Sequence, residues 1–379
     1  MAITRINIED FLVLGKEHPV LDVRSPGEYG HAHIPGAISL PLFSNEERKV
    51  VGTAFKQESK EKAVKLGLDF FGVKMVKIVE EVEALCKVRD KNYEVPSEDK
   101  LGALDSNIVL VHCWRGGMRS AGVAWLLDLY GFKVFTLVGG YKVYRKWVLQ
   151  QFEKRYSFNI LGGYTGSGKT EVLQALHKKN ELVIDLEKLA SHKGSAFGRL
   201  GQPIQPSQEM FENLLATALK NTEERKEKQV DSYSKTSCIW LEDESQRIGE
   251  VNIPNSLFSQ MRDRPVFFLD IPFEERLHFI VTQYGKFDKI ELVNSIIRIK
   301  KRLGGLETKM AINYLIEDNV KDGFAVLLAY YDKSYGKSLQ NRTNLPSLLT
   351  KVDCSQVNDD KNANTLLKFQ IKSKKVYHD

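Results

Sequence analysis

Short hydrophobic runs alternate with longer amphipathic stretches along most of the chain. The runs lack a polar face, which is typical of strands buried on both sides of a parallel sheet. The amphipathic stretches between them have the periodicity of helices that cover such a sheet. The pattern therefore predicts an α/β fold with parallel strands, formed by PVLDVRS (19–25), ISLPL (38–42), IVLVH (108–112), VFTLV (134–138), FNILGG (158–163), ELVIDLE (181–187), SCIWLEDES (237–245) and PVFFLDIP (265–272).

Residues 43–104 interrupt this alternation and are predicted to form a helical insertion. Hydrophobic residues recur at every third position in its centre, with lysine and glutamate between them: Val73, Val76, Val79, Val82 and Leu85. We interpret this spacing as a helix face packed against a core. The earlier stretch VVGTAFKQ (50–57) precedes a dense run of charges, and we interpret it as an exposed recognition element.

Length and composition favour an ordinary globular protein of two domains. The chain has 379 residues, of which 42% are hydrophobic and 27% charged, and about 150 residues per domain suggests two or three domains. We predict two, residues 1–148 and 149–379. The net charge of +6 allows a polyanionic partner without requiring one. The chain starts without a signal sequence and has no apolar run long enough to cross a bilayer, so we expect a cytoplasmic protein with no membrane partner, and we favour a monomer.

A cysteine stands at the turn between a buried strand and a helix that starts near Arg119. The four cysteines lack the paired spacing of a metal site, and Cys113 directly follows the strand IVLVH. Inward-pointing loop amides and the helix N-terminus would both favour a thiolate there. The predicted site consists of the nucleophile Cys113, the phosphate-gripping Arg115 and Arg119, and the oxyanion loop Trp114, Gly116, Gly117 and Met118. The alternative is a buried structural cysteine.

A second anion site is predicted in GYTGSGKT (163–170), which satisfies the P-loop pattern GxxxxGK[ST] between a strand and a helix. Its amides and Lys169 would hold a diphosphate, and Thr170 could hold Mg²⁺. The predicted diphosphate-binding residues are Gly163, Thr165, Gly166, Ser167, Gly168, Lys169 and Thr170. We assign no metal ligand and expect no tightly bound cofactor, while Mg²⁺ is compatible with the motif. A guanine-reading Asn-Lys-x-Asp string is absent, which argues against a GTPase.

Acidic and basic residues that could take part in this second site follow the motif in the sequence. Asp185 and Glu242 end predicted strands, where parallel sheets bind ligands, and we favour them as site acids. A long glycine- and proline-rich loop (192–213) follows the first of them. We predict weak RNA-contacting roles for His192 and Arg199 in that loop and for Arg298, Lys300, Lys301 and Arg302 on a later helix. The alternative for the basic helix is a solvated charged face.

Four motifs follow one another in the first half: Asp-Val-Arg at 22–24, HIPGA at 33–37, the cysteine loop and Gly-Gly-Tyr at 139–141. In these motifs the first half resembles the rhodanese domain family. Two departures stand out. Cys113 and Arg119 are six positions apart, one more than in the usual sulfurtransferase loop, and this wider spacing also occurs in rhodanese-like phosphatases and arsenate reductases. The second departure is the insertion at 43–104. The resemblance implies a rhodanese-like domain followed by a P-loop domain with a parallel sheet.

Five strings occur in order along nearly the whole chain: VVGTAFKQ, CWRGGMRS, GGYTGSGKT, DLEKLASHKGSAFG and LEDESQRIGEVNIP. In these strings the chain resembles the tRNA 2-selenouridine synthase family. The resemblance implies that 2-thiouridine at the wobble position of the tRNAs for lysine, glutamate and glutamine is S-geranylated by geranyl diphosphate. Selenium from selenophosphate then replaces the S-geranyl group. It further implies that Cys113 takes up the selenium as a Cys–Se adduct and that the P-loop holds geranyl diphosphate, although the sequence equally permits ATP.

Three other functions remain open from the sequence. The first is a phosphatase or arsenate reductase built on the Cys-x5-Arg loop, although this loop contains no Asp or Glu to serve as a general acid. The second is a tRNA sulfurtransferase in which the P-loop activates the substrate with ATP. The third is an RNA-binding module whose cysteine loop is no longer catalytic.

Overall fold

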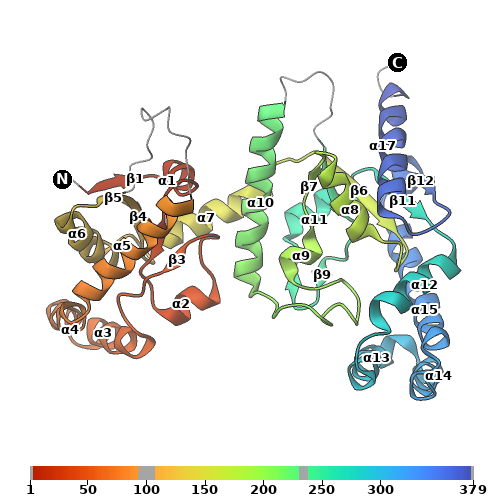
Figure 1. Cartoon of the computed structure of the whole chain (residues 1–379), viewed down its shortest axis with the longest axis horizontal. Helices are drawn as coiled ribbons and strands as arrows, with labels where there is room; N and C mark the ends of the chain where they lie inside the picture. Colours follow the sequence, from red (N-terminus) through yellow and green to blue (C-terminus); the bar gives the residue numbers. More distant parts are fainter. Residues whose placement is uncertain (1–2, 93–106, 230–237, 377–379) are drawn as a thin grey trace. The chain divides into compact units, whose positions relative to one another are not determined.

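The chain forms two compact units in a computed structural model, residues Met1–Gln150 and Gln151–Asp379. The structure describes residues 3–92, 107–229 and 238–376 (Figure 1). The division falls inside helix α7 (Gly140–Glu153), whereas the sequence placed it after residue 148. The predicted insertion extends to residue 104, and its last part, residues 93–104, lies outside the described residues.

The N-terminal unit is built on a parallel five-stranded sheet in the order β1-β5-β4-β2-β3. The central strand β4 is buried at all five positions, as its uninterrupted hydrophobic run predicts. Because all strands run in the same direction, their carboxyl ends meet at one edge of the sheet, and the cysteine loop begins there. The strands are β1 (Thr4–Ile6), β2 (Val20–Asp22), β3 (Ile38–Ser39), β4 (Ile108–His112) and β5 (Lys133–Leu137).

Helices flank this sheet, and the expected α/β architecture is confirmed. The first helix spans Ile8–Leu14, and the helix after the cysteine loop begins at Met118, one residue before the expected start. The remaining insertion is helical, as predicted, and contributes three helices. The helices of this unit are α1 (Ile8–Leu14), α2 (Pro26–His31), α3 (Asn45–Gln57), α4 (Lys60–Gly72), α5 (Met75–Asn92), α6 (Met118–Tyr130) and α7.

The packing predicted for the insertion is partly wrong. Val79 and Val82 are buried, but Val73 and Val76 are 86% and 72% exposed. A helix turns through about 100° per residue, so side chains three positions apart drift steadily away from a common face. The buried face instead follows helical spacing and consists of Ile78, Val79, Val82 and Cys86.

The C-terminal unit contains a second parallel sheet, in the order β12-β11-β6-β8-β7. The strand β6, which precedes the P-loop, is central and buried throughout. A short antiparallel pair, β9 and β10, stands apart from it. The strands are β6 (Phe158–Gly163), β7 (Leu182–Val183), β8 (Ile239–Glu242), β9 (Arg247–Ile248), β10 (Val251–Asn252), β11 (Val266–Asp270) and β12 (Leu349–Asp353).

A group of helices in this unit has a hydrophobic core of its own. Side chains of α12, α13, α14 and α15 form this cluster, and Figure 1 shows these helices gathered beyond one end of the sheet. No described helix is long and apolar enough to cross a membrane. The helices are α8 (Lys169–Lys178), α9 (Leu186–Ala190), α10 (Gln208–Gln229), α11 (Asn255–Arg262), α12 (Phe273–Tyr284), α13 (Lys289–Leu303), α14 (Gly305–Ile316), α15 (Val320–Gln340), α16 (Leu345–Leu348) and α17 (Asp359–Val376).

Candidate functional site

Cys113 lies at the carboxyl end of β4, at the base of a loop whose other residues reach the surface. Its side chain is 3% exposed, whereas Trp114, Arg115, Gly117 and Met118 around it are exposed. Its Sγ lies 3.2 Å from the Oγ of Ser120, a buried residue at the start of α6. The sulfur is thus recessed behind the loop and bordered on one side by a hydroxyl group.

The surroundings of the sulfur favour its ionised form. Burial raises the pKa of the Cys113 thiol, but the Ser120 hydroxyl, the main-chain N–H groups of Ser120 and Arg115, and the charge of Arg119 lower it more, so the pKa lies below its ordinary value. Ser120 Oγ also lies 3.0 Å from the carbonyl oxygen of Gly117. Since the hydroxyl has one proton, it can turn toward the sulfur once the thiol ionises. The geometry supports a nucleophilic thiolate.

Glycines allow the loop to pack tightly against the start of α7. A Cβ on Gly140 would lie 2.3 Å from the carbonyl oxygen of Cys113, and Gly116 has a φ of +63° that other residues rarely adopt. The N–H of Tyr141 donates to the Cys113 carbonyl at 2.9 Å, and the N–H of Lys142 donates to the Trp114 carbonyl at 3.0 Å. The Gly-Gly-Tyr segment therefore holds the loop in place.

Arg119, at the end of the loop, is held by a residue that the sequence reasoning missed. Its Nη1 and Nη2 donate to the two Glu28 carboxylate oxygens at 2.7 Å and 3.3 Å. Burial raises the pKa of Glu28, but the hydrogen bond and charge of Arg119 outweigh it and bring the value to about 2. The available signal was Ser25-x-x-Glu28, a capping box at the start of α2.

Polar residues are also buried beneath the loop. Asp22 and Arg24 form an ion pair that is almost fully buried, and the Arg24 guanidinium stacks 3.8 Å from the centre of the Tyr141 ring. His112 is fully buried, and burial lowers its pKa to about 4 despite the nearby Asp22 charge. His112 is therefore neutral at physiological pH and is not a ready proton donor.

The P-loop of the C-terminal unit has the expected strand–loop–helix form. Gly163, Gly166 and Gly168 have positive φ angles, as a loop wrapped around an anion requires. Lys169 Nζ donates to the Gly163 carbonyl at 3.0 Å, so the ammonium group lies over the loop. Thr170 Oγ1 donates to Glu187 Oε2 at 3.0 Å, and the Ser167 side chain is fully buried.

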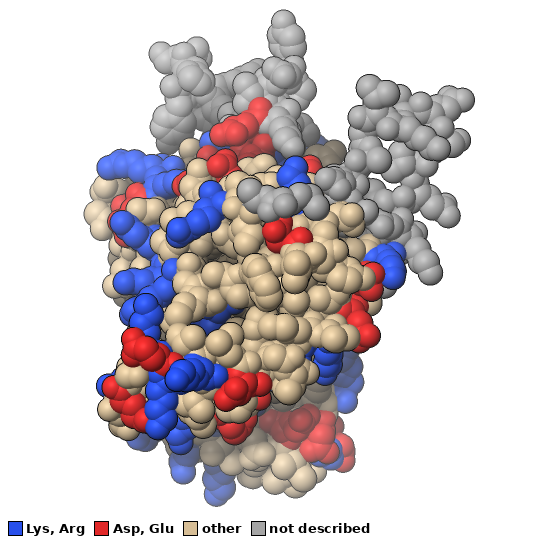
Figure 2. Space-filling model, turned by 90° about the vertical axis from the view of Figure 1, so that its left-hand side faces the viewer, with Lys and Arg blue, Asp and Glu red and all other residues tan. Residues whose placement is uncertain are grey.

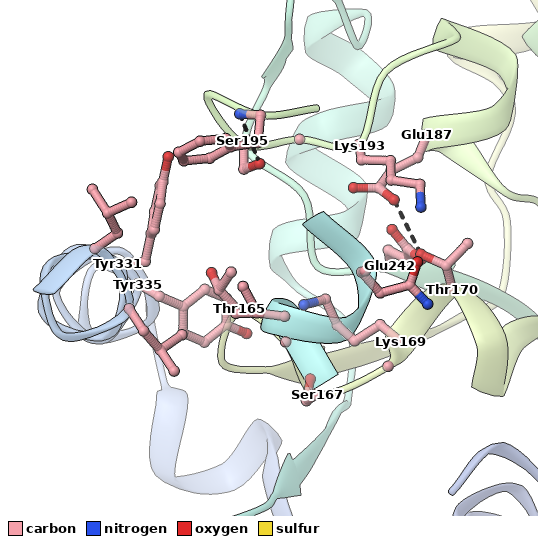
Figure 3. Close-up of a pocket in the computed structure, with 18 of the residues that line it drawn as sticks. Thr165, Ser167, Lys169, Thr170, Glu187, Lys193, Ser195, Glu242, Tyr331 and Tyr335 are labelled. Atoms are coloured by element: carbon pink, nitrogen blue, oxygen red, sulfur yellow. Dashed lines mark hydrogen bonds between the residues drawn. The ribbon is translucent and has the colours of Figure 1, made fainter. Parts of the chain in front are cut away.

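Three glutamates converge beside Lys169 and Thr170. Carboxylate oxygens of Glu187, Glu242 and Glu244 lie within 4.8 Å of one another, and Figure 3 shows Glu187 and Glu242 directed toward Thr170. Burial and mutual repulsion raise the pKa of each of the three. Glu242 is completely buried, and neither of its oxygens has a hydrogen-bond partner. A divalent cation would neutralise such a cluster, and the oxygen donors suit Mg²⁺.

Of the two acids predicted from the sequence, the structure places only Glu242 in this cluster. Asp185 instead caps helix α9, where its Oδ1 accepts the N–H of Lys188 at 2.8 Å. Glu187 stands two positions after Asp185, and Glu244 two positions after Glu242. Sequence reasoning missed both, because short turns past the strand ends decide which carboxylate faces inward.

The P-loop opens into a cavity of about 340 Å³. Helices α12 and α15 line its far side with aromatic and aliphatic side chains, namely Phe279, Ile280, Tyr284, Phe324, Leu327, Leu328, Tyr330 and Tyr331. Tyr335 connects the two sides: its hydroxyl accepts the Gly163 N–H at 3.3 Å and donates to Asp243 at 2.7 Å. The cavity thus combines an anion-binding end with an apolar end (Figure 3).

The predicted basic residues separate into different environments. Arg302 lines the cavity together with Lys193, which the sequence reasoning did not select. His192 is 9% exposed, so it is poorly placed for direct contact with RNA. Lys300 and Lys301 on α13, Arg298 on the same helix, and Arg199 are exposed, and their RNA-binding role stays a prediction. Figure 2 shows a face of the N-terminal unit instead, on which Lys and Arg side chains gather along one edge with acidic side chains among them.

Comparison with known proteins identifies both units. Residues 9–69 match the model of the rhodanese-like domain, and residues 156–363 match the model described as the tRNA 2-selenouridine synthase AAA domain. The first match ends inside the helical insertion, and the second covers the P-loop, the three glutamates and the apolar cavity.

Relatives that match most of the chain support the same assignment. A protein from Shewanella sediminis named tRNA 2-selenouridine synthase is 34% identical over 308 residues, covering 76% of this chain and 75% of the relative. Relatives of the same name from Sulfurovum sp. and Hydrogenovibrio crunogenus are each 32% identical, covering 85% and 86% of this chain and 89% and 91% of the relatives. With matches of this identity and coverage across both units, the chain belongs to the tRNA 2-selenouridine synthase family.

Proposed function

We propose that this protein converts 2-thiouridine in tRNA to 2-selenouridine in two steps, with a separate centre for each. The P-loop cavity transfers a geranyl group from geranyl diphosphate to the sulfur of the base. The Cys113 loop then handles selenophosphate, whose selenium replaces the S-geranyl group. The observation that carries this proposal is the union of an anion-binding loop and an apolar wall in one cavity. A diphosphate ester of a hydrocarbon chain has the same two-part character.

The first step needs charge stabilisation at the diphosphate. The thiouridine sulfur attacks the first carbon of the geranyl chain, the C–O bond breaks, and pyrophosphate leaves with the electron pair while the base loses its N3 proton. Lys169 and the loop amides face the charge that develops on pyrophosphate. Phe324 and Leu328 are among the residues that would contact the chain and exclude water. ATP would satisfy the loop, and its adenine could stack on the aromatic rings of the wall, but the aliphatic side chains Ile280, Leu327 and Leu328 favour a hydrocarbon chain.

A divalent cation fits the same centre as a further part of the proposal. Glu187, Glu242 and Glu244 would hold Mg²⁺ beside Thr170, because three neighbouring carboxylates, one of them buried without a hydrogen-bond partner, favour a positive charge between them. When bound, the cation would supply positive charge to the departing pyrophosphate. Residues Lys193 and Arg302 on the cavity wall would add further charge from the protein itself.

The second step belongs to the cysteine loop. The main-chain N–H groups around Cys113, with Arg115 and Arg119, suit a tetrahedral oxyanion such as selenophosphate. Selenium attacks C2 of the base, and the geranyl thiolate leaves, which is a better leaving group than the unmodified sulfur. The base must reach both centres, so we propose a flipped-out wobble uridine in the tRNAs for lysine, glutamate and glutamine.

Nucleoside mass spectrometry tests the whole reaction. Transfer RNA carrying 2-thiouridine is incubated with the protein and selenophosphate, with geranyl diphosphate or ATP as the second substrate. We expect S-geranyl-2-thiouridine with geranyl diphosphate alone and 2-selenouridine when selenophosphate is added. Formation of 2-selenouridine that depends on ATP and not on geranyl diphosphate would instead support ATP activation at the P-loop.

A further inference from the structure

The electron balance of selenophosphate decides which of its atoms Cys113 can attack, if the cysteine loop binds selenophosphate as proposed above. Selenium in selenophosphate is already at the oxidation level of selenide, and the phosphorus is pentavalent. If the thiolate took up selenium as a Cys–Se adduct, the electron pair of the broken P–Se bond would stay on phosphorus and release phosphite. Phosphate could then form only with an added oxidant. The Cys–Se adduct that the family resemblance implies therefore cannot form with release of phosphate unless an oxidant is added.

We propose that the Cys113 thiolate attacks the phosphorus of selenophosphate and forms a phosphocysteine intermediate. The S–P bond forms, the P–Se bond breaks, and hydrogen selenide ion leaves with the electron pair. Water then attacks phosphorus, the S–P bond breaks, the thiolate returns and phosphate is released. The selenide ion adds to C2 of the S-geranylated base and expels the geranyl thiolate. No oxidation or reduction takes place at any stage, and each atom is accounted for.

The geometry of the loop suits a phosphoryl group. Seven residues from Cys113 to Arg119 make up the ring that would surround the anion, and hydrogen bonding by the main-chain N–H groups of Arg115 and Ser120 lowers the pKa of the Cys113 thiol. When a thiolate attacks phosphorus, three oxygens spread around the axis of attack and need donors in such a ring. Arg119 closes the ring and is held in position by its two hydrogen bonds to Glu28.

The site suits selenide as a leaving group but has no general acid to protonate an alkoxide leaving group. Asp22 and Glu28, the carboxyl groups described around this centre, are both ionised because Arg24 and Arg119 oppose the effect of burial and keep their pKa values low. His112 is neutral and sealed in the core. An alkoxide leaving group requires a proton from a general acid. Hydrogen selenide is a far stronger acid than an alcohol, so its anion leaves without one.

Ser120 stabilises the leaving group of the second half of the cycle, which is the Cys113 thiolate. Its Oγ, 3.2 Å from the sulfur, can donate to the thiolate as the S–P bond breaks. A hydrogen bond to a charged group of this kind contributes roughly tenfold to hundredfold in rate. Ser120→Ala should therefore slow the breakdown of the intermediate by about that factor more than it slows its formation, which makes the phosphocysteine observable.

The experiment uses selenophosphate labelled with radioactive phosphorus, the full-length protein, and no tRNA. After rapid acid quench, Ser120→Ala should carry label on the peptide that contains Cys113, at several-fold the level of the wild-type protein. Cys113→Ala should carry none. Phosphorus NMR should show phosphate as the product, and elemental analysis of the quenched protein should show phosphorus without an equivalent of selenium. Glycerol phosphate, whose leaving group needs a proton, should not be hydrolysed.

The contrary outcomes separate this inference from the proposed function. Selenium bound to the protein without phosphorus, or release of phosphite, would overturn attack on phosphorus while leaving the cysteine loop as the selenophosphate site. Normal formation of 2-selenouridine by Cys113→Ala would show direct attack of selenophosphate on the base and would overturn the inference too. If the wild-type protein neither consumes selenophosphate nor forms 2-selenouridine, both the inference and the proposed second step are wrong.

Discussion

The cysteine loop and the P-loop share a backbone plan, yet different groups stand at their centres. Each follows a buried central strand, β4 or β6, and each leads into a helix, α6 or α8. The first places a recessed sulfur among main-chain N–H groups. The second places an ammonium group over the loop and opens into an apolar cavity. Similar loops thus serve different chemistry, because one contains a nucleophile and the other contains only groups that bind.

The electrostatic character of the two centres also differs. Around Cys113, hydrogen bonds and the Arg119 charge lower the pKa of the thiol, so the protein itself stabilises the reactive anion. Beside the P-loop, burial and crowding raise the pKa values of three carboxyl groups, so the protein leaves an excess of negative charge. The first centre stabilises its own anion, whereas the second favours a cation. Substitutions at each centre test this contrast.

Removing the nucleophile should have the largest effect. Cys113→Ser keeps the shape of the side chain, but a hydroxyl group is hardly ionised at neutral pH, so we expect selenium incorporation to fall by at least about 10³-fold. S-geranylated tRNA should accumulate at the wild-type rate, because the other centre is intact. Nucleoside mass spectrometry measures both products. Equal loss of geranylation would contradict the separation of the two centres.

Lys169→Ala should have the next largest effect, and in the opposite step. Removing an ammonium group that faces the leaving pyrophosphate should lower geranyl transfer by about 10² to 10³-fold. Consumption of selenophosphate in the absence of tRNA should not change. Lys178→Ala is the matched control, because Lys178 is an exposed lysine on the same helix. A similar loss in the control would point to damage of α8 rather than loss of charge at the loop.

Glu242→Gln tests cation binding separately from diphosphate binding. Replacing the unpartnered carboxylate should weaken Mn²⁺ binding, measured by calorimetry, by about tenfold to hundredfold, since it removes one of three anionic ligands. Glu275→Gln is the control, because it removes an exposed carboxylate at the start of α12, away from the three glutamates. Unchanged Mn²⁺ affinity in Glu242→Gln, or no binding by the wild-type protein, would remove the cation from the proposal.

These centres show what a sequence can reveal about a site. The order strand, loop and helix is local, so hydrophobic runs and glycine spacing predicted both loops, with α6 beginning at Met118 instead of Arg119. Glu28 lies 91 positions before Arg119, and no local pattern connects the two. Its capping box is a local signal for a helix start, and such a signal gives no indication of the arginine across the fold.

Whether a side chain is exposed or buried is also hard to predict where the spacing of hydrophobic residues fits more than one helix face. Val73 and Val76 were expected in the core, but Val73 precedes α5, Val76 lies in its first turn, and both side chains are exposed. His192 was grouped with RNA-binding residues because a long polar loop contains it, yet the loop folds back and buries it near Gly198 and Gly249. In both cases tertiary packing, which no short window of sequence specifies, decides the environment.

The ion pair at the cysteine loop should contribute to stability in a pH-dependent way. Glu28 has a pKa of about 2 in the folded protein, below its ordinary value of 4.5. Its stabilising contribution is therefore complete above about pH 4.5 and is lost as the pH falls toward 2. Glu28→Gln should cost about 2 kcal/mol in the free energy of unfolding at pH 7, and this difference should shrink through that range.

Denaturant titrations from pH 7 down to pH 3 measure the Glu28 effect. Glu17→Gln, which removes an exposed carboxylate from the same unit, is the control and should change stability little at any of these pH values. If the Glu28→Gln penalty stays constant as the pH falls, the carboxylate charge is not its source. The pairing with Arg119 would then have no measurable role in holding the loop.

The smallest effect is expected from the exposed cations of α13, and it tests which unit holds the RNA. Neutralising Arg298, Lys300 and Lys301 should weaken tRNA binding only a few-fold. It should also reduce the slope of log affinity against log salt by roughly 0.7 to 0.9 for each RNA phosphate that the protein no longer neutralises. Neutralising Lys178, Lys309 and Lys361 removes the same charge from exposed positions elsewhere in the unit and is the control. Equal slopes in the two triple variants would mean that α13 acts only through net charge. Segment 50–57 of the N-terminal unit would then be the next surface to test, because Val50, Thr53, Phe55, Lys56 and Gln57 are exposed there although Ala54 is buried.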